Sequence, residues 1–80
     1  MEPEREVLRN AINDIIEGRR TREDVASWAE RKMLDLEYER KTDLVAWEVL
    51  KAIAGADLEV EPGSYLHCME DIQSWMEELN

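Results

Sequence analysis

The 80-residue sequence has few of the residues from which covalent cross-links and phosphate sites are built. It contains one cysteine, one histidine, three glycines and no phenylalanine. The single cysteine, Cys68, excludes an intramolecular disulfide and any metal site that needs several thiolates. The glycines Gly18, Gly55 and Gly63 stand far apart, which excludes a glycine-rich loop around a phosphate group.

Long apolar runs are also missing. No segment approaches the roughly 18 consecutive apolar residues that a membrane-spanning helix requires. The first residues, Met-Glu-Pro-Glu-Arg-Glu, lack the basic and then apolar order of a secretion signal. We therefore expect a cytoplasmic protein that has no membrane partner.

The one histidine does not complete a catalytic site. His67 and Cys68 are adjacent, and neighbouring residues on a helix point about 100° apart, so they cannot face each other as base and nucleophile. His67 and Glu70 have the spacing of half a di-iron site, but the other half needs a second histidine. We expect no enzymatic activity and no cofactor.

The segment Asp57-x-Glu59-x-Glu61 begins like a calcium-binding loop. Such a loop needs glycine at its sixth position and glutamate at its twelfth, where this chain has Pro62 and Cys68. We therefore predict no metal site.

Apolar residues recur at three- and four-residue steps in four segments, as in amphipathic helices. They predict helices over residues 4–18, 21 to about 36–40, 42–54 and 67–79. Thr21 and Thr42 are suitable N-caps, while Gly18 and Gly55 would end the first and third helices, Gly55 with a positive φ. The sequence predicts one all-α domain over residues 1–80, a small antiparallel four-helix bundle with an irregular acidic loop before the last helix.

Two further features concern packing. The third segment is apolar over more than half of its circumference, which predicts a central helix that packs against all its neighbours. Trp28, Trp47 and Trp75 fall on inward faces and should belong to the core. Between residues 56 and 64, Leu58 and Val60 alternate with acidic residues, which predicts an extended segment with one face buried.

Charge is distributed unevenly along the chain. Residues 1–41 hold eleven acidic and nine basic residues, whereas residues 42–80 hold nine acidic residues and one basic residue, Lys51, within a total net charge of −10. Such a field attracts a basic protein and repels nucleic acid and anionic lipid. We expect a basic protein partner and no direct nucleic-acid binding; the alternative is a merely solvating surface.

The acidic loop and the start of the last helix are the candidate partner-binding surface. Tyr65 would be its anchor, because tyrosine joins a large apolar face to a polar tip. The alternative for Tyr65 is a turn residue packed on the last helix. The candidate residues are Asp57, Glu59, Glu61, Tyr65, Glu70 and Asp71.

Several short pieces between Val25 and Leu79 resemble small acidic helical bacterial proteins that accompany toxins. The pieces are Ser27-Trp28-Ala29, Trp47, Gly55-Ala56-Asp57-Leu58, Pro62-Gly63-Ser64-Tyr65-Leu66-His67, Asp71-Ile72 and Trp75. The resemblance implies an immunity protein that binds a cognate toxin domain, a basic nuclease, and neutralises it.

Two alternatives remain open. An acidic nucleic-acid mimic would inhibit a restriction or CRISPR nuclease with the same carboxylates. A helical adaptor subunit would expose an apolar stripe and self-associate through Val45, Val49 or another exposed residue of the third helix. The sequence does not fix the oligomeric state.

Overall fold

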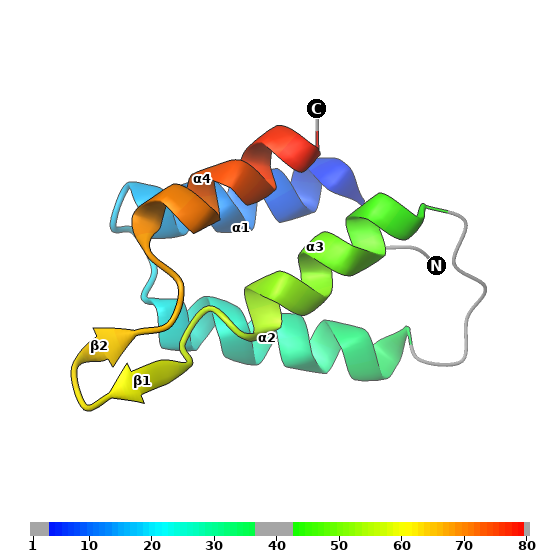
Figure 1. Cartoon of the computed structure of the whole chain (residues 1–80). Helices are drawn as coiled ribbons and strands as arrows, with labels where there is room; N and C mark the ends of the chain where they lie inside the picture. Colours follow the sequence, from blue (N-terminus) through cyan, green and yellow to red (C-terminus); the bar gives the residue numbers. More distant parts are fainter. Residues whose placement is uncertain (1–3, 37–42, 80) are drawn as a thin grey trace.

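The computed structural model describes residues 4–36 and 43–79 and contains four helices and a short hairpin (Figure 1). The elements are α1 (Arg5–Ile16), α2 (Arg22–Asp35), α3 (Leu44–Ala54), β1 (Glu59–Glu61), β2 (Ser64–Tyr65) and α4 (Met69–Glu78). Successive helices run in opposite directions, which confirms the predicted antiparallel four-helix fold. None of the helices in these two ranges is both long and apolar enough to cross a membrane.

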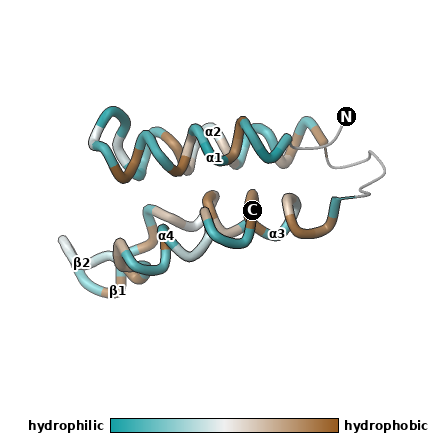
Figure 2. The backbone as a smooth tube through the Cα atoms, turned by 90° about the horizontal axis from the view of Figure 1, so that it is seen from above, coloured by the Kyte–Doolittle hydropathy of each residue, from teal (hydrophilic) through white to brown (hydrophobic). Residues whose placement is uncertain are grey.

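The helices form two layers. Figure 2 shows α1 and α2 on one side of the molecule and α3 and α4 on the other. Helix α3 contacts each of the other three helices, as expected for the most apolar segment. Because α1 and α2 share a layer, the half of the sequence that is rich in cations is also separate in space from the acidic half.

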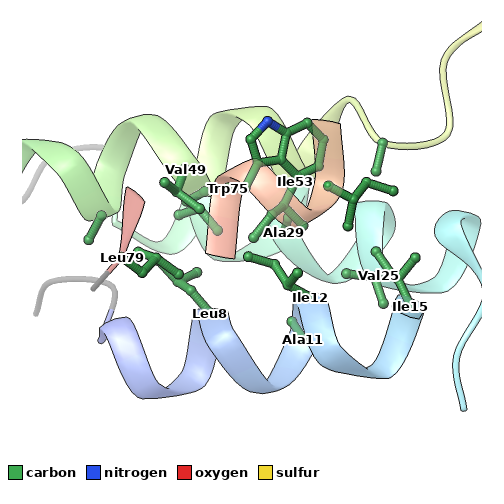
Figure 3. Close-up of a cluster of buried hydrophobic side chains, with 14 of the residues drawn as sticks. Leu8, Ala11, Ile12, Ile15, Val25, Ala29, Val49, Ile53, Trp75 and Leu79 are labelled. Atoms are coloured by element: carbon green, nitrogen blue, oxygen red, sulfur yellow. The ribbon is translucent and has the colours of Figure 1, made fainter. Parts of the chain in front are cut away.

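The core lies between the layers and consists of apolar side chains. Figure 3 shows the residues of α1 pointing toward those of α3 and α4. The largest side chains that are completely shielded from solvent are Leu8, Ile12, Val25, Val49, Leu50, Ile53, Ile72 and Leu79. Trp75 is also buried, whereas Trp28 and Trp47 are only partly buried and pack at the edge of the core.

The helix starts follow local hydrogen bonds. The Thr21 hydroxyl accepts a hydrogen bond from the Asp24 N–H at 3.1 Å, which confirms Thr21 as the cap of α2. Asp43 caps α3, because its Oδ1 accepts from the Ala46 N–H at 3.1 Å. The expected cap, Thr42, and the far end of the predicted second helix lie outside the described residues.

The two glycines expected to end helices behave differently. Gly18, after α1, has φ +75°, a conformation that favours glycine. The positive φ predicted for Gly55 is wrong, because its φ is −99° and the chain continues in a right-handed turn. A Cβ at Gly55 would lie 3.2 Å from Cδ1 of Leu58, so a larger residue here requires a small shift of that exposed side chain.

The segment before α4 is a two-stranded antiparallel hairpin with a β-bulge in β1. Glu59 lies opposite Tyr65, and Glu61 lies opposite Ser64. The prediction that this segment buries one face is wrong, because Leu58 and Val60 are 53% and 62% exposed. The hairpin projects beyond the ends of the helices (Figure 1).

Arg5 fastens the start of α1 to two other helices. Its guanidinium donates two hydrogen bonds to the Asp43 carboxylate, at 2.8 and 3.0 Å, and a third to the Leu79 carbonyl at 3.1 Å. The hydrogen bond from Arg5, followed by the one from the Ala46 N–H, lowers the pKa of Asp43 below its ordinary value of 3.8. One carboxylate therefore caps α3 and holds α1 beside it.

We expect Asp43→Asn to reduce the stability of the fold at neutral pH while preserving the cap, because asparagine caps helices as well as aspartate. The Asp43 carboxylate has a lowered folded pKa, so its contribution is complete above the unfolded pKa and is lost as pH falls through the folded pKa. Urea-unfolding midpoints of the two proteins should differ at pH 7 and converge near about pH 2. Asp35→Asn, at an exposed site, is the matched control. A difference in unfolding midpoint between Asp43→Asn and the unaltered protein that does not change with pH would contradict the role given to the Asp43 carboxylate.

Candidate functional site

Tyr65, the predicted anchor, links the hairpin to the first turn of α2. Its hydroxyl donates a hydrogen bond to Glu23 Oε1 at 2.5 Å, and the Arg22 guanidinium carbon lies 4.3 Å from the centre of its ring. The bond to the Glu23 carboxylate raises the pKa of Tyr65 and lowers the pKa of Glu23. Tyr65 packs against α2, rather than against the last helix as the sequence alternative proposed.

Two of the predicted acidic residues stabilise turns. Glu59 accepts a hydrogen bond from the Gly63 N–H at 2.7 Å, inside the hairpin turn. Asp71 accepts one from the Cys68 N–H at 3.3 Å at the start of α4, and its carboxylate lies 3.5 Å from Nδ1 of His67. Both side chains therefore have a local structural role.

The remaining acidic residues make no such contacts. Within the described chain, Asp57, Glu61 and Glu70 take part in no hydrogen bond or ion pair of their side chains. Asp57 precedes the hairpin, Glu61 ends β1, and Glu70 lies in the first turn of α4. The hairpin and the start of α4 lie at the same end of the molecule, so the structure brings the six predicted residues to that end (Figure 1). Whether this end binds a partner stays a prediction.

Arg22 is the residue at this end that the sequence did not single out. It donates hydrogen bonds to the carbonyls of Ala56, at 3.3 Å, and of His67, in addition to its contact with the Tyr65 ring. It thereby joins α2 to the end of α3 and to the connection before α4. These partners lie 34 and 45 residues away along the chain, so no local pattern in the sequence identifies them.

Metal-ligating groups are dispersed in the described ranges. No three His, Cys, Asp or Glu side chains of residues 4–36 and 43–79 are arranged to hold a metal ion. Cys68 is an exposed free cysteine at the start of α4.

The two layers carry different charges. Residues 4–36, with α1 and α2, hold eight acidic and seven basic side chains, a net charge of −1. Residues 43–79, with α3, the hairpin and α4, hold nine acidic side chains and one basic one, a net charge of −8. The overall acidity of the chain therefore belongs mainly to one side of the molecule.

Most cations of the α1–α2 layer already have partners. Arg5 and Arg9 both donate to the Leu79 carbonyl, and Arg19 pairs with Asp14 at 2.9 Å. These side chains are therefore directed toward other parts of the protein.

Three cations of this layer remain loosely held or free. Arg20 lies 3.7 Å from the nearest oxygen of Asp14 and 6.0 Å from the centre of the Trp28 ring. Arg31 and Lys32 take part in no hydrogen bond or ion pair with any described residue. Since Trp28, Arg31 and Lys32 stand three and four positions apart on α2, they share one side of that helix. We call Arg20, Trp28, Arg31 and Lys32 the α2 basic surface.

The sequence places this chain near a bacterial protein without an assigned function. It is 32% identical over 69 residues to the uncharacterized protein YxzC of Bacillus subtilis (strain 168). The aligned part is 86% of this chain but 56% of that protein, so the chain spans just over half the length of its curated relative. No solved structure matches the chain.

The family match covers nearly the whole chain and corrects the expected function. Residues 3–79 match the model of the family described as YxzC DNA-binding protein. This match overturns the resemblance to immunity proteins, the expected basic toxin or nuclease partner and the expected absence of nucleic-acid binding. Those expectations came from the acidic second half of the sequence, which forms the α3–α4 layer, and from short matching pieces between Val25 and Leu79. The chain belongs to the YxzC DNA-binding protein family.

Proposed function

We propose that this chain binds DNA through the α2 basic surface. The observation that carries the proposal concerns Arg31 and Lys32, two neighbouring cations of α2. Neither has a carboxylate partner among the described residues, and both belong to the less acidic layer. Free cations beside an aromatic ring are suited to contact phosphates and bases. The description of the family supports this proposal.

The acidic layer restricts how DNA approaches. The molecule measures 36 × 24 × 20 Å. Nine acidic residues belong to residues 43–79, whose helices α3 and α4 form the layer opposite α1 and α2 (Figure 2). Electrostatic repulsion between exposed charges is screened beyond about 8 Å at physiological salt. DNA on the α1–α2 side is therefore largely shielded from the nine carboxylates of the other layer.

The small number of free cations limits the kind of contact that this chain can make with DNA. Few cations are free, and Asp24 and Asp35 flank them on α2, so only a small number of phosphates can be neutralised. Phosphate contacts position a protein on DNA without reading its sequence. We therefore propose a non-enzymatic, salt-sensitive contact of modest affinity by this chain alone, in the cytoplasm, where bacterial DNA lies.

We expect Arg31→Gln and Lys32→Gln each to weaken binding to a short labelled duplex roughly three- to tenfold at about 0.05 M salt, because each removes one phosphate contact. The slope of log affinity against log salt should fall by about 1 in each variant. Fluorescence anisotropy between about 0.05 and 0.2 M salt measures both quantities.

Lys51→Gln is the matched control for Lys32→Gln. It changes the net charge by the same amount, but Lys51 lies on α3 and pairs with Glu48 at 2.9 Å. The control should leave the salt slope unchanged. Equal losses in Lys32→Gln and Lys51→Gln would show that net charge alone governs the affinity, and would contradict the assignment of the α2 basic surface.

A further inference from the structure

The indole ring of Trp28 lies at the boundary between the core and the solvent-facing side of α2. It packs against the buried cluster but is itself only partly buried, unlike Trp75 of α4. The guanidinium carbon of Arg20, in the connection between α1 and α2, lies over this ring at 6.0 Å from its centre. One face of the ring is therefore directed toward a cation rather than into the core.

Arg20 does not make a close contact with this ring. Cation–π contacts extend to about 6 Å from the ring centre, so the observed 6.0 Å is at their outer limit. In the same molecule the guanidinium carbon of Arg22 lies 4.3 Å from the centre of the Tyr65 ring. Arg20 and Trp28 thus leave more space between them than a guanidinium that rests directly on an aromatic ring.

The separation of Arg20 and Trp28 is close to what an intervening base requires. Successive bases of a strand are about 3.4 Å apart, so a base between a guanidinium and an indole needs about 7 Å. Arg20 would have to withdraw from the observed 6.0 Å by roughly 1 Å. It is loosely held, because its nearest oxygen of Asp14 is 3.7 Å away and Asp14 has a closer partner in Arg19, at 2.9 Å.

We propose that Trp28 stacks on an unpaired base beneath Arg20, so that the α2 basic surface binds single-stranded DNA in preference to duplex DNA. Aromatic rings hold single strands by stacking on their bases, with a further contribution from arginine. Arg31 and Lys32 follow Trp28 by one turn on the same side of α2, where they meet phosphates of the same strand. The inference deepens the proposed function and rests on it.

The partial burial of Trp28 favours an unpaired base over a base pair. In a duplex both faces of each base are covered by neighbours, and a protein reaches these faces only with a side chain that protrudes as a wedge. Trp28 is held against the core and is only partly exposed, so it is poorly suited to act as a wedge. A base of a single strand can instead turn its face toward the ring.

The charges around Trp28 are compatible with a polyanion although the whole chain has a net charge of −10. The α2 basic surface contributes three cations, and Asp24 and Asp35 are the carboxylates on the same side of this helix. The local balance is therefore slightly positive. Stacking does not depend on charge, so it adds affinity that salt does not screen.

The test compares a labelled single strand of about 12 thymidines with a labelled duplex of the same length, both added to the full chain. At about 0.15 M salt the single strand should bind about three- to tenfold more tightly in fluorescence anisotropy. This preference should grow with salt, because affinity for single strands falls less steeply with salt than affinity for duplexes. The tryptophan fluorescence should decrease with the single strand, because a stacked base quenches the indole, and should not decrease with the duplex.

Trp28→Leu removes the stacking ring and keeps an apolar side chain at the edge of the core. This variant should lose both the preference for the single strand and the fluorescence decrease, while circular dichroism checks that it is folded. Trp47→Leu is the matched control, because it makes the same change at a partly buried tryptophan of α3, in the opposite layer. The control should keep the preference for the single strand.

Arg20→Lys tests the same site without altering the core or the net charge. Lysine lacks the planar guanidinium that covers the base. The variant should therefore lose about two- to fivefold in affinity for the single strand and keep its affinity for the duplex. Arg31→Lys makes the same exchange at a residue assigned to phosphates and should change neither affinity.

The two forms of DNA separate this inference from the proposed function. Equal or tighter binding of the duplex at about 0.15 M salt would overturn the inference, as would a single-strand preference that survives in both Trp28→Leu and Arg20→Lys. Duplex binding that depends on Arg31 and Lys32 but not on Trp28 would reject stacking alone and keep the α2 basic surface. Binding of neither form at about 0.05 M salt would instead contradict the proposed function.

Discussion

Leu50→Ala is expected to leave the chain largely unfolded at room temperature. Leu50 is fully buried on α3, which contacts each of the other three helices. Replacing a buried leucine by alanine costs about 2–5 kcal/mol of unfolding free energy, through lost apolar burial and the cavity that remains. An 80-residue core rarely supplies more than roughly 3–5 kcal/mol, so one such cavity removes most of the stability.

Far-ultraviolet circular dichroism and urea titration measure this loss directly. Leu66→Ala is the matched control, because it makes the same chemical change at a residue that is 52% exposed beside the hairpin. The control should lose less than about 1 kcal/mol. If Leu50→Ala retained the full helical signal and lost no more than the control, α3 would not be the centre of the core.

Helices were predictable from this sequence because their signals are local. The three- and four-residue spacing of apolar residues and the Thr21 cap each depend on neighbours within one or two turns. The end of α3 was less predictable. Gly55 was expected to adopt a positive φ, whereas its φ is −99°, and no spacing rule tells from the sequence which of these conformations a glycine after a helix adopts.

The hairpin and its contacts could not be predicted, because they depend on distant residues. Alternation of Leu58 and Val60 with acids indicated an extended segment, which is correct, but burial also requires a covering element. In the described part of the chain both side chains stay more than half exposed. The bond between Tyr65 and Glu23 joins residues 42 positions apart, and only the packing of the hairpin on α2 reveals it.

The candidate site was hidden by the same limitation. A cation is available to DNA only when the fold gives it no partner, and the sequence does not show which cations are paired. Arg19 and Arg31 look alike in sequence, yet Arg19 pairs with Asp14 and Arg31 stays free among the described residues. The count of charges in each half of the sequence does not show such differences, and the acidic second half therefore led to the expectation of a basic protein partner.

Arg22→Ala is expected to lower the unfolding free energy by about 2–3 kcal/mol, a large part of the stability of a chain this size. A hydrogen bond from a charged donor is worth about 1.5–3 kcal/mol. Arg22 donates two from one nitrogen, to carbonyls on either side of the hairpin; both are only partly buried and the one to Ala56 is long, at 3.3 Å, so together they are expected to contribute about as much as one full bond. Its loss also removes the cation beneath the Tyr65 ring. Hydrogen exchange should show the hairpin amides opening before those of α3 in this variant.

Arg31→Ala is the control, since it removes an arginine from the same helix without removing a contact within the described residues, and its stability should change by less than about 0.5 kcal/mol. Arg22→Lys should recover only part of the loss, because an ammonium group lacks the planar guanidinium that lies against the Tyr65 ring while its Nη1 donates to both carbonyls. For DNA binding the order of the two variants should be reversed, with Arg31→Ala having the larger effect on the salt slope and Arg22→Ala the smaller. While it remains folded, Arg22→Ala should keep the salt slope of the unaltered protein, because Arg22 is directed toward Ala56 and His67. A reduced slope for Arg22→Ala, with an unchanged slope for Arg31→Ala, would move the DNA contact from the α2 basic surface to the hairpin end.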